Sequence, residues 1–164
     1  MKKLFLFLVL VIFLIGCSKT PTGSVTIEPR INEGQIASFK MTKDPVCFSN
    51  GKPVVRLFAT SWCPHCNWIK TTFDKVMNEY VAAGKISAHH WIVDVGDDAL
   101  TASKESIIPP DEMGIYKRYN PDGSVPTFVF ACKYVRIGNA YETQNNLKAE
   151  EAEFRAVLEE ILKK

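Results

Sequence analysis

Two cysteines stand three positions apart at the point where an extended apolar run gives way to a helical pattern. The run Val54–Ala59 leads, after two polar residues, into Trp62-Cys63-Pro64-His65-Cys66. A helix that begins at Cys63 points its free N–H groups and its positive dipole end at that sulfur, which favours thiolate over thiol. Pro64 then falls at the first helical position, where its missing N–H costs nothing. This placement predicts a redox-active dithiol, with Cys66 one turn into the helix.

The N-terminus has the pattern of an export signal. A short basic start is followed by an unbroken apolar run, Leu4–Ile15, and then by Gly16-Cys17. A run of this length is typical of a signal-peptide core, since a spanning helix needs roughly 20 apolar residues. The end of the run resembles the lipobox of prokaryotic lipoproteins, in which the peptide is cut before a cysteine that carries the lipid. We expect residues 1–17 to be a signal peptide and Cys17 to be lipidated; the alternatives are an uncleaved anchor or a plain secretory signal.

Export sets the redox context of the other cysteines. An exported, membrane-anchored chain lies on the extracytoplasmic side, in the periplasm or at the cell surface, where disulfides persist. The remaining cysteines can be read there as two pairs, drawn from Cys47, Cys63, Cys66 and Cys132. Without Lys2 and Lys3 the chain has 18 basic and 18 acidic residues, so the mature form is near neutral. No basic run indicates a nucleic-acid partner.

The chain of 164 residues, 46% of them hydrophobic, fits one globular domain and an appendage. Residues 18–35 are polar and punctuated by proline, so we expect a flexible tether that holds a domain of residues 36–164 off the membrane. Periodicity within the domain predicts strands at 36–41, 54–59, 86–95, 125–132 and 135–137, and helices at 63–83, 110–119 and from 147 onward. Segment 96–110 is expected to be a polar connection, and residues 133–134 a tight one.

This order of elements resembles the thioredoxin superfamily from about residue 36 to the C-terminus. The motif Trp-Cys-x-x-Cys follows the second strand, Val125-Pro126-Thr127 precedes the fourth, and Gly138 follows the last. The resemblance implies an α/β thioredoxin fold, with a central mixed β-sheet of four to five strands flanked by helices. It also implies a cis Val125–Pro126 bond opposite the cysteines, which leaves the Val125 backbone free to bind a substrate chain as an added short strand.

The resemblance also implies a pairing for the other two cysteines. In the superfamily's sheet, the strand at Val54 runs antiparallel beside the strand at Thr127. The start of the first strand therefore lies near the end of the second, which brings Cys47 toward Cys132. We expect a structural disulfide between them, which would stabilise the fold by several kcal/mol in the chain-entropy model. The alternative is two unrelated buried thiols.

The five-residue motif assigns a role to each of its members. We expect Cys63, at the helix start, to be the exposed attacking or attacked sulfur, and Cys66, shielded within the helix, to resolve the mixed disulfide. We expect Trp62 to pack beside the motif and limit access to it. His65 can be cationic near neutral pH and would add to the dipole that stabilises the Cys63 thiolate. The Pro64-His65 pair matches disulfide oxidases of the DsbA type, whose reduced form is favoured.

One position departs from the superfamily's pattern. Many members have a buried acidic residue six positions before the first cysteine, which accepts the proton of the second. Leu57 occupies that position here, so proton transfer from Cys66 must use water or another group. Asp94 ends the next predicted strand, but nothing in the sequence places it at the sulfurs.

Metal binding is the main rival use of these ligands. Cys63, Cys66 and some of the histidines could hold zinc, but structural zinc usually recruits a second closely spaced pair, which is absent. His89 and His90 are neighbours on a predicted strand, so they point to opposite faces and cannot share a site. Covalent haem attachment would need a histidine directly after Cys66, where Asn67 stands. We expect neither a metal nor a cofactor.

Taken together, these patterns predict a membrane-tethered thiol–disulfide oxidoreductase that acts through Cys63 and Cys66 on exported, cysteine-containing proteins. A membrane or soluble redox partner would recycle the dithiol. The character of His65 favours an oxidase or isomerase over a reductase. The alternative from another class is a binding module, in which the same fold delivers a peptide or metal and holds its dithiol as an inert disulfide.

Overall fold

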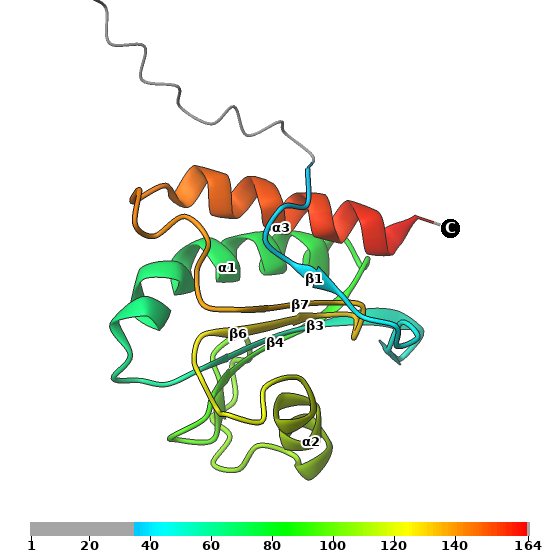
Figure 1. Cartoon of the computed structure of the whole chain (residues 1–164). Coiled ribbons are helices and arrows are strands. Elements are labelled where there is room, and N and C mark those ends of the chain that lie inside the picture. The colour runs from blue at the N-terminus through cyan, green and yellow to red at the C-terminus, as the bar shows by residue number, and fades with distance from the viewer. Residues whose placement is uncertain (1–34, 164) are drawn as a thin grey trace, which may run out of the picture. The chain divides into compact units, whose positions relative to one another are not determined.

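The computed structural model describes residues 35–163 (Figure 1). The predicted signal peptide, the lipidation of Cys17 and all but the last residue of the predicted tether lie outside the described residues. The architecture is mixed α/β, with a seven-stranded mixed sheet and three helices. No helix within residues 35–163 is both long enough and apolar enough to cross a membrane.

The sheet is built around one long strand, β3 (Lys52–Ala59), of which seven of the eight residues are buried. β3 pairs in parallel with β4 (Ser87–Ile92) and antiparallel with β6 (Thr127–Phe130). The strand order is β1-β7-β6-β3-β4-β5, with β1 (Lys40–Met41), β7 (Tyr134–Ile137) and β5 (Asp97–Asp98) outside the centre, and with β2 (Phe48–Ser49) paired to β3 as a short hairpin. A strand buried on both faces needs cover on both sides, and the helices supply it.

Helices α1 (Pro64–Ala82) and α3 (Leu147–Leu162) lie on one face of the sheet, and α2 (Pro110–Tyr119) lies on the other (Figure 1). The predicted apolar stripe of α1 is buried as expected: Ile69, Phe73, Val76, Met77 and Tyr80. It joins Phe128, Phe130 and Phe154 in the larger core. A smaller core under α2 contains Phe58, Trp91 and Tyr116. Fully burying each such side chain stabilises the fold by roughly 1.5–3 kcal/mol.

The sheet has more strands than the predicted four to five because two unpredicted two-residue strands, β2 and β5, join it, and β1 is also only two residues long. Such strands are too short to carry a periodic pattern, and only pairing with a neighbour defines them. The predicted strand 36–41 shrinks to β1 because the Ala37 and Ser38 N–H groups both donate to Glu153 on α3 instead of to another strand. The predicted strand 86–95 ends at Ile92, whose carbonyl accepts the Gly96 N–H in a turn.

The tight turn between the last two strands lies at Ala131-Cys132, two residues before the predicted position. Both residues have positive φ, at 52° and 58°, a conformation that glycine or asparagine normally supplies in such hairpins. Partners outside the turn hold it in place: the Cys132 carbonyl accepts hydrogen bonds from the hydroxyls of Thr42 and Tyr119. The turn therefore depends on tertiary contacts that its own sequence does not signal.

The predicted disulfide between Cys47 and Cys132 is confirmed. Their Cα atoms lie 5.5 Å apart, within the range that a disulfide spans. The expected strand geometry explains the approach, since β3 runs antiparallel to β6 with Val55 opposite Phe130. The Cys47 N–H also donates to the Ala131 carbonyl at 2.9 Å.

Candidate functional site

The candidate site lies where α1 begins. Cys63 is the N-cap of α1, in an extended conformation, and Pro64 is at the first helical position as predicted. The Cys63 sulfur accepts a hydrogen bond from the Cys66 N–H at 3.2 Å. No acidic side chain occupies the first turn of α1. The sulfur therefore lies at the positive end of a 19-residue helix, where a thiolate is stabilised by the helix dipole and by N–H donation.

Cys66 has a different environment, one turn into the helix. Both cysteines are free thiols in this structure, and Cys66 is only 2% exposed. Burial and the hydrogen bond with Cys63 raise the pKa of the Cys66 thiol to about 12, although a backbone hydrogen bond from Thr60 works against the rise. Cys66 is thus protonated at neutral pH and must lose a proton before it can attack a disulfide.

The expectation that Cys63 is exposed is wrong. Its exposure is 3%, close to that of Cys66, because both cysteines pack into the larger core. The expectation that Trp62 packs beside the motif and limits access is also wrong, since Trp62 is 71% exposed. Cys63 belongs instead to the larger core, against which Val125 also packs. Neighbouring side chains must therefore move before an exchange partner can reach the sulfur.

The segment opposite Cys63 is the Val125–Pro126 pair, whose peptide bond is cis as predicted. The Val125 carbonyl oxygen lies 3.9 Å from the Cys63 sulfur. The Val125 backbone makes no hydrogen bond to another backbone group within residues 35–163. Gly138, which follows β7, donates its N–H to the Pro126 carbonyl at 2.8 Å and fixes the loop to the sheet. A polar backbone edge is therefore available beside the candidate nucleophile.

His65 has an acidic partner that the sequence did not indicate. Its Nδ1 lies 2.9 Å from both carboxylate oxygens of Glu142, in the loop after β7. Asn139 joins the cluster, because its amide donates to the Glu142 carboxylate and to the His65 carbonyl. Burial opposes ionisation of Glu142, but the hydrogen bonds from Asn139 and His65 prevail and lower its pKa. The negatively charged carboxylate of Glu142 therefore lies beside the His65 imidazole.

Leu57 and Asp94 are the two positions at which the sequence raised the question of an acidic helper for Cys66. Leu57 is fully buried in the larger core. Asp94 accepts hydrogen bonds from the backbone N–H and the hydroxyl of Ser61, which lower its pKa. Asp94 thus anchors the turn that leads into Trp62, and its carboxylate is engaged there.

The two adjacent histidines lie on opposite faces of β4, as predicted. His89 stacks on Trp91 and pairs with Asp98. His90 packs edge-on against Phe73 of α1 and pairs with Asp74. Among residues 35–163, no three of the histidine, cysteine and acidic side chains gather as a metal site.

Asp74 is a second residue that sequence reasoning missed. Cys66, Lys70 and Asp74 follow one another at intervals of four along α1, and all three line a cavity of about 360 Å³ that also includes His90. A spacing of four puts side chains on the same face of a helix, so this juxtaposition carried a sequence signal. Glu142 and Asn139 carried none, because they lie in an irregular loop.

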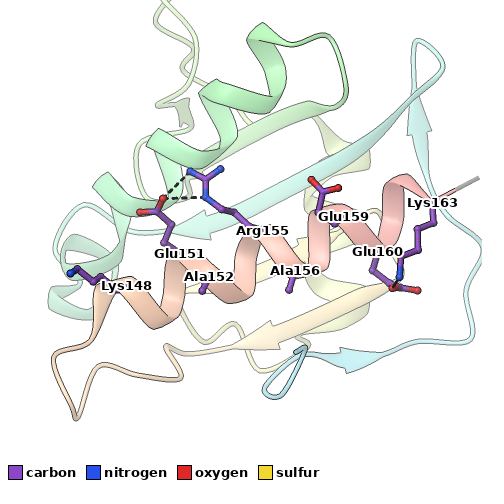
Figure 2. A pocket seen from close by; sticks show the side chains of 8 residues that line it. All are labelled: Lys148, Glu151, Ala152, Arg155, Ala156, Glu159, Glu160 and Lys163. Carbon is purple, nitrogen blue, oxygen red and sulfur yellow. Dashed lines mark hydrogen bonds and ion pairs between the residues drawn. The ribbon is translucent and has the colours of Figure 1, made fainter. Parts of the chain in front are cut away.

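A second hollow follows α3 (Figure 2). It is lined by seven residues of that helix and by the residue that follows it: Lys148, Glu151, Ala152, Arg155, Ala156, Glu159, Glu160 and Lys163. Arg155 pairs there with Glu151, and Lys163 with Glu160 (Figure 2). None of the sequence-predicted site residues lies in this hollow.

Comparisons with known protein families, with curated proteins and with solved structures gave no match. The chemistry of the site is therefore inferred from its own residues.

Proposed function

We propose that this chain is a membrane-tethered thiol–disulfide oxidoreductase of the thioredoxin superfamily, which exchanges disulfides with exported proteins through Cys63 and Cys66. The sequence pattern of the first 35 residues supports the tether, the lipid on Cys17 and the extracytoplasmic location. A membrane or soluble redox partner returns the dithiol to its starting state after each exchange.

One observation carries the proposal: two free thiols of unequal character share the first turn of a long helix. The Cys63 sulfur receives the Cys66 N–H and the positive end of α1, which favour its thiolate. Cys66 is held as a thiol by burial. This asymmetry supports Cys63 as the sulfur that exchanges with the substrate and Cys66 as the sulfur that closes or opens the internal disulfide.

The Val125 backbone supports a mode of substrate binding. An extended peptide that carries a cysteine would pair with the free backbone of Val125 and thereby bring its sulfur to Cys63. Main-chain pairing tolerates many sequences, which suits an enzyme that acts on a range of exported proteins.

The direction of exchange follows from which form of the dithiol is favoured. In the oxidising direction the Cys63–Cys66 disulfide takes two electrons from a substrate dithiol, and the substrate leaves as a disulfide. The helix dipole and the nearby His65 favour the Cys63 thiolate and therefore the reduced form of the dithiol. A dithiol whose reduced form is favoured takes electrons from its substrate, which supports oxidation or isomerisation. The carboxylate of Glu142 beside His65 works against that preference.

The test is a trapping experiment with Cys66→Ser. Without the resolving thiol, the variant should accumulate mixed disulfides with reduced, cysteine-containing exported proteins, and mass spectrometry should place each of them on Cys63. The matched control is Cys63→Ser, which keeps the buried Cys66 and should trap nothing. The reduction potential of the wild-type pair then gives the direction: a value near about −120 mV indicates an oxidase and one near about −270 mV a reductase.

The burial of Cys63, at 3% exposure, favours a second candidate, a peptide- or metal-delivery module whose dithiol does no exchange. Alkylation separates the two. Rapid alkylation of Cys63 below pH 7 supports the enzyme, whereas a thiol that reacts only near pH 8.5 and exchanges with no disulfide supports the module.

A further inference from the structure

Cys66 and His90 line the same cavity, although they come from different elements. The cavity, of about 360 Å³, is bounded by the end of β3, by α1 and by β4. Two buried polar atoms along it have no hydrogen-bond partner within the described part of the chain: the hydroxyl oxygen of Thr60 and Nε2 of His90. A polar cavity of this size accommodates water, which buried polar atoms without partners require.

The other ring nitrogen of His90 fixes which form of the imidazole faces the cavity. Nδ1 lies 2.7 Å from a carboxylate oxygen of Asp74. A carboxylate only accepts hydrogen bonds, so Nδ1 carries a proton; in the form of the ring with a single proton, Nε2 then has the lone pair, and it faces the cavity. The His90 side chain is only 2% exposed, so this lone pair does not face bulk solvent. In this form His90 presents a buried proton acceptor, Nε2, to the cavity, while its Nδ1 contacts the Asp74 carboxylate.

The remaining cavity groups do not offer an equivalent acceptor. Thr60, Ser61 and Asn67 also line the cavity, but their side chains have no group that titrates near neutral pH. Lys70 is a cation and has no lone pair to give in its usual state. Asp74 points one oxygen at His90 and so acts through it.

We propose that His90, positioned by Asp74, exchanges a proton with Cys66 through the water of this cavity during disulfide exchange. The inference rests on the proposed function, since it concerns the proton of the Cys66 thiol in the same reaction. It identifies the group that replaces an acidic side chain at the position of Leu57.

The step balances in both directions. When the internal disulfide closes, the Cys66 thiol gives its proton to His90 Nε2, and its sulfur attacks Cys63. The Cys63–Cys66 bond forms as the bond from Cys63 to the substrate sulfur breaks, and the substrate leaves as a thiolate. In reverse, a substrate thiolate attacks Cys63, and Cys66 leaves with the electron pair and takes the proton from the His90 imidazolium. No oxidant beyond the exchanging disulfide is needed.

The charges around His90 come from three elements. α1 contributes Asp74 and Lys70, which line the cavity. β5 contributes Asp98, which accepts the His90 backbone N–H at 2.8 Å. On its own strand, His89 lies on the opposite face and pairs with Asp98. Asp74 is the member of this set that contacts the imidazole of His90, and its charge favours the imidazolium that forms when Cys66 gives up a proton.

The test follows the two halves of the reaction separately in stopped flow with 5,5′-dithiobis(2-nitrobenzoate). Attack by Cys63 releases a first nitrothiobenzoate, and attack by Cys66 on the resulting mixed disulfide releases a second. In His90→Gln we expect the first release at the wild-type rate and the second about ten- to a hundredfold slower at pH 7. The wild-type second rate should level off as pH rises, whereas that of His90→Gln should keep rising, because hydroxide must then take the proton.

Two further variants complete the design. His89→Gln removes the neighbouring histidine on the opposite face and should keep both wild-type rates. Asp74→Asn, at a partly exposed position, serves if His90→Gln does not fold, as judged by thermal unfolding. In this variant the rate of the second release should level off at a lower pH than in the wild type, because the His90 imidazolium loses the Asp74 carboxylate that stabilises it.

The outcomes distinguish this inference from the proposed function. If wild-type Cys63 releases no first nitrothiobenzoate, the proposed function fails, and the role of His90 fails with it. If the first release occurs, and the second keeps its wild-type rate and pH profile in the folded His90→Gln and Asp74→Asn variants, only the role of His90 is overturned.

Discussion

At the scale of single residues, the charge beside Cys63 is set by two side chains of opposite sign. His65 follows Pro64 in the first turn of α1, and Glu142 lies 2.9 Å from its Nδ1. When His65 is cationic, the pair is close to neutral as seen from the sulfur. The charge effect expected of His65 on the sulfur is then partly cancelled by Glu142.

This pairing predicts a faster reaction when the carboxylate is removed at low pH. Glu142→Gln removes the negative charge that faces His65, so that in its cationic form the imidazole acts on the sulfur unopposed. We expect Cys63 to be alkylated by iodoacetamide about two- to fivefold faster, as befits an exposed ion pair, with the modified residue located by mass spectrometry.

Two controls separate charge from loop opening. Asn139→Ala removes contacts from the same loop without a change of charge, and it should not reproduce the effect. The acceleration should also disappear in a His65→Ala background and fade at high ionic strength. An equal acceleration in the His65→Ala background would show that the loop, and not the charge, controls access to Cys63.

At the scale of elements, α2 is tied to the sheet by one carboxylate. Glu112 of α2 accepts two hydrogen bonds from the Arg56 guanidinium of β3 and a third from the Trp91 indole of β4. Burial opposes ionisation of Glu112, but the Arg56 guanidinium prevails and lowers its pKa below the usual 4.5. A carboxylate with a lowered pKa stabilises the folded state fully above its usual pKa, and this stability is lost as pH falls through the lowered value.

We therefore expect the free energy of unfolding to fall between pH 7 and pH 3 by about 1–2 kcal/mol more in the wild type than in Glu112→Gln. Urea unfolding at a series of pH values measures the difference. Asp111→Asn, the exposed neighbour on α2, should follow the wild-type curve. Parallel curves for wild type and Glu112→Gln would mean that other acids govern the loss of stability in acid.

The same scale shows how far the sequence predicts this fold. The three helices and the central strands were predicted because each carries a run long enough to express its period, as in the stripe from Ile69 to Tyr80. The strands β2 and β5 were not, because two residues hold no pattern and their pairing is tertiary, and of the predicted strand 36–41 only the two residues of β1 form one. The position of Cys63 at the helix start, with Cys66 one turn further on, could be predicted from local helix chemistry. The partners Glu142 and His90 could not, because long-range contacts bring them to the site.

At the scale of the whole molecule, the disulfide joins the segment before β3 to the turn after β6, across 85 positions of sequence. In the chain-entropy model, closing a loop of this length raises the free energy of the unfolded chain by about 4.5 kcal/mol. Removing a native disulfide typically costs about 2–5 kcal/mol of stability. The bond also ends at Cys132, whose positive φ is held by contacts from Thr42 and Tyr119. These contacts remain without the bond, so the turn is expected to survive its loss.

Removing the bond should therefore lower stability without changing the fold. The background is Cys63→Ala/Cys66→Ala, which leaves Cys47 and Cys132 as the cysteines of the folded domain. Adding Cys47→Ala/Cys132→Ala should lower the free energy of unfolding, measured in urea, by about 2–4 kcal/mol. Dithiothreitol should lower the stability of the background protein by a similar amount and leave the quadruple variant unchanged. A loss below about 0.5 kcal/mol would mean that the unfolded chain is already compact around these two positions, so that the bond restricts little.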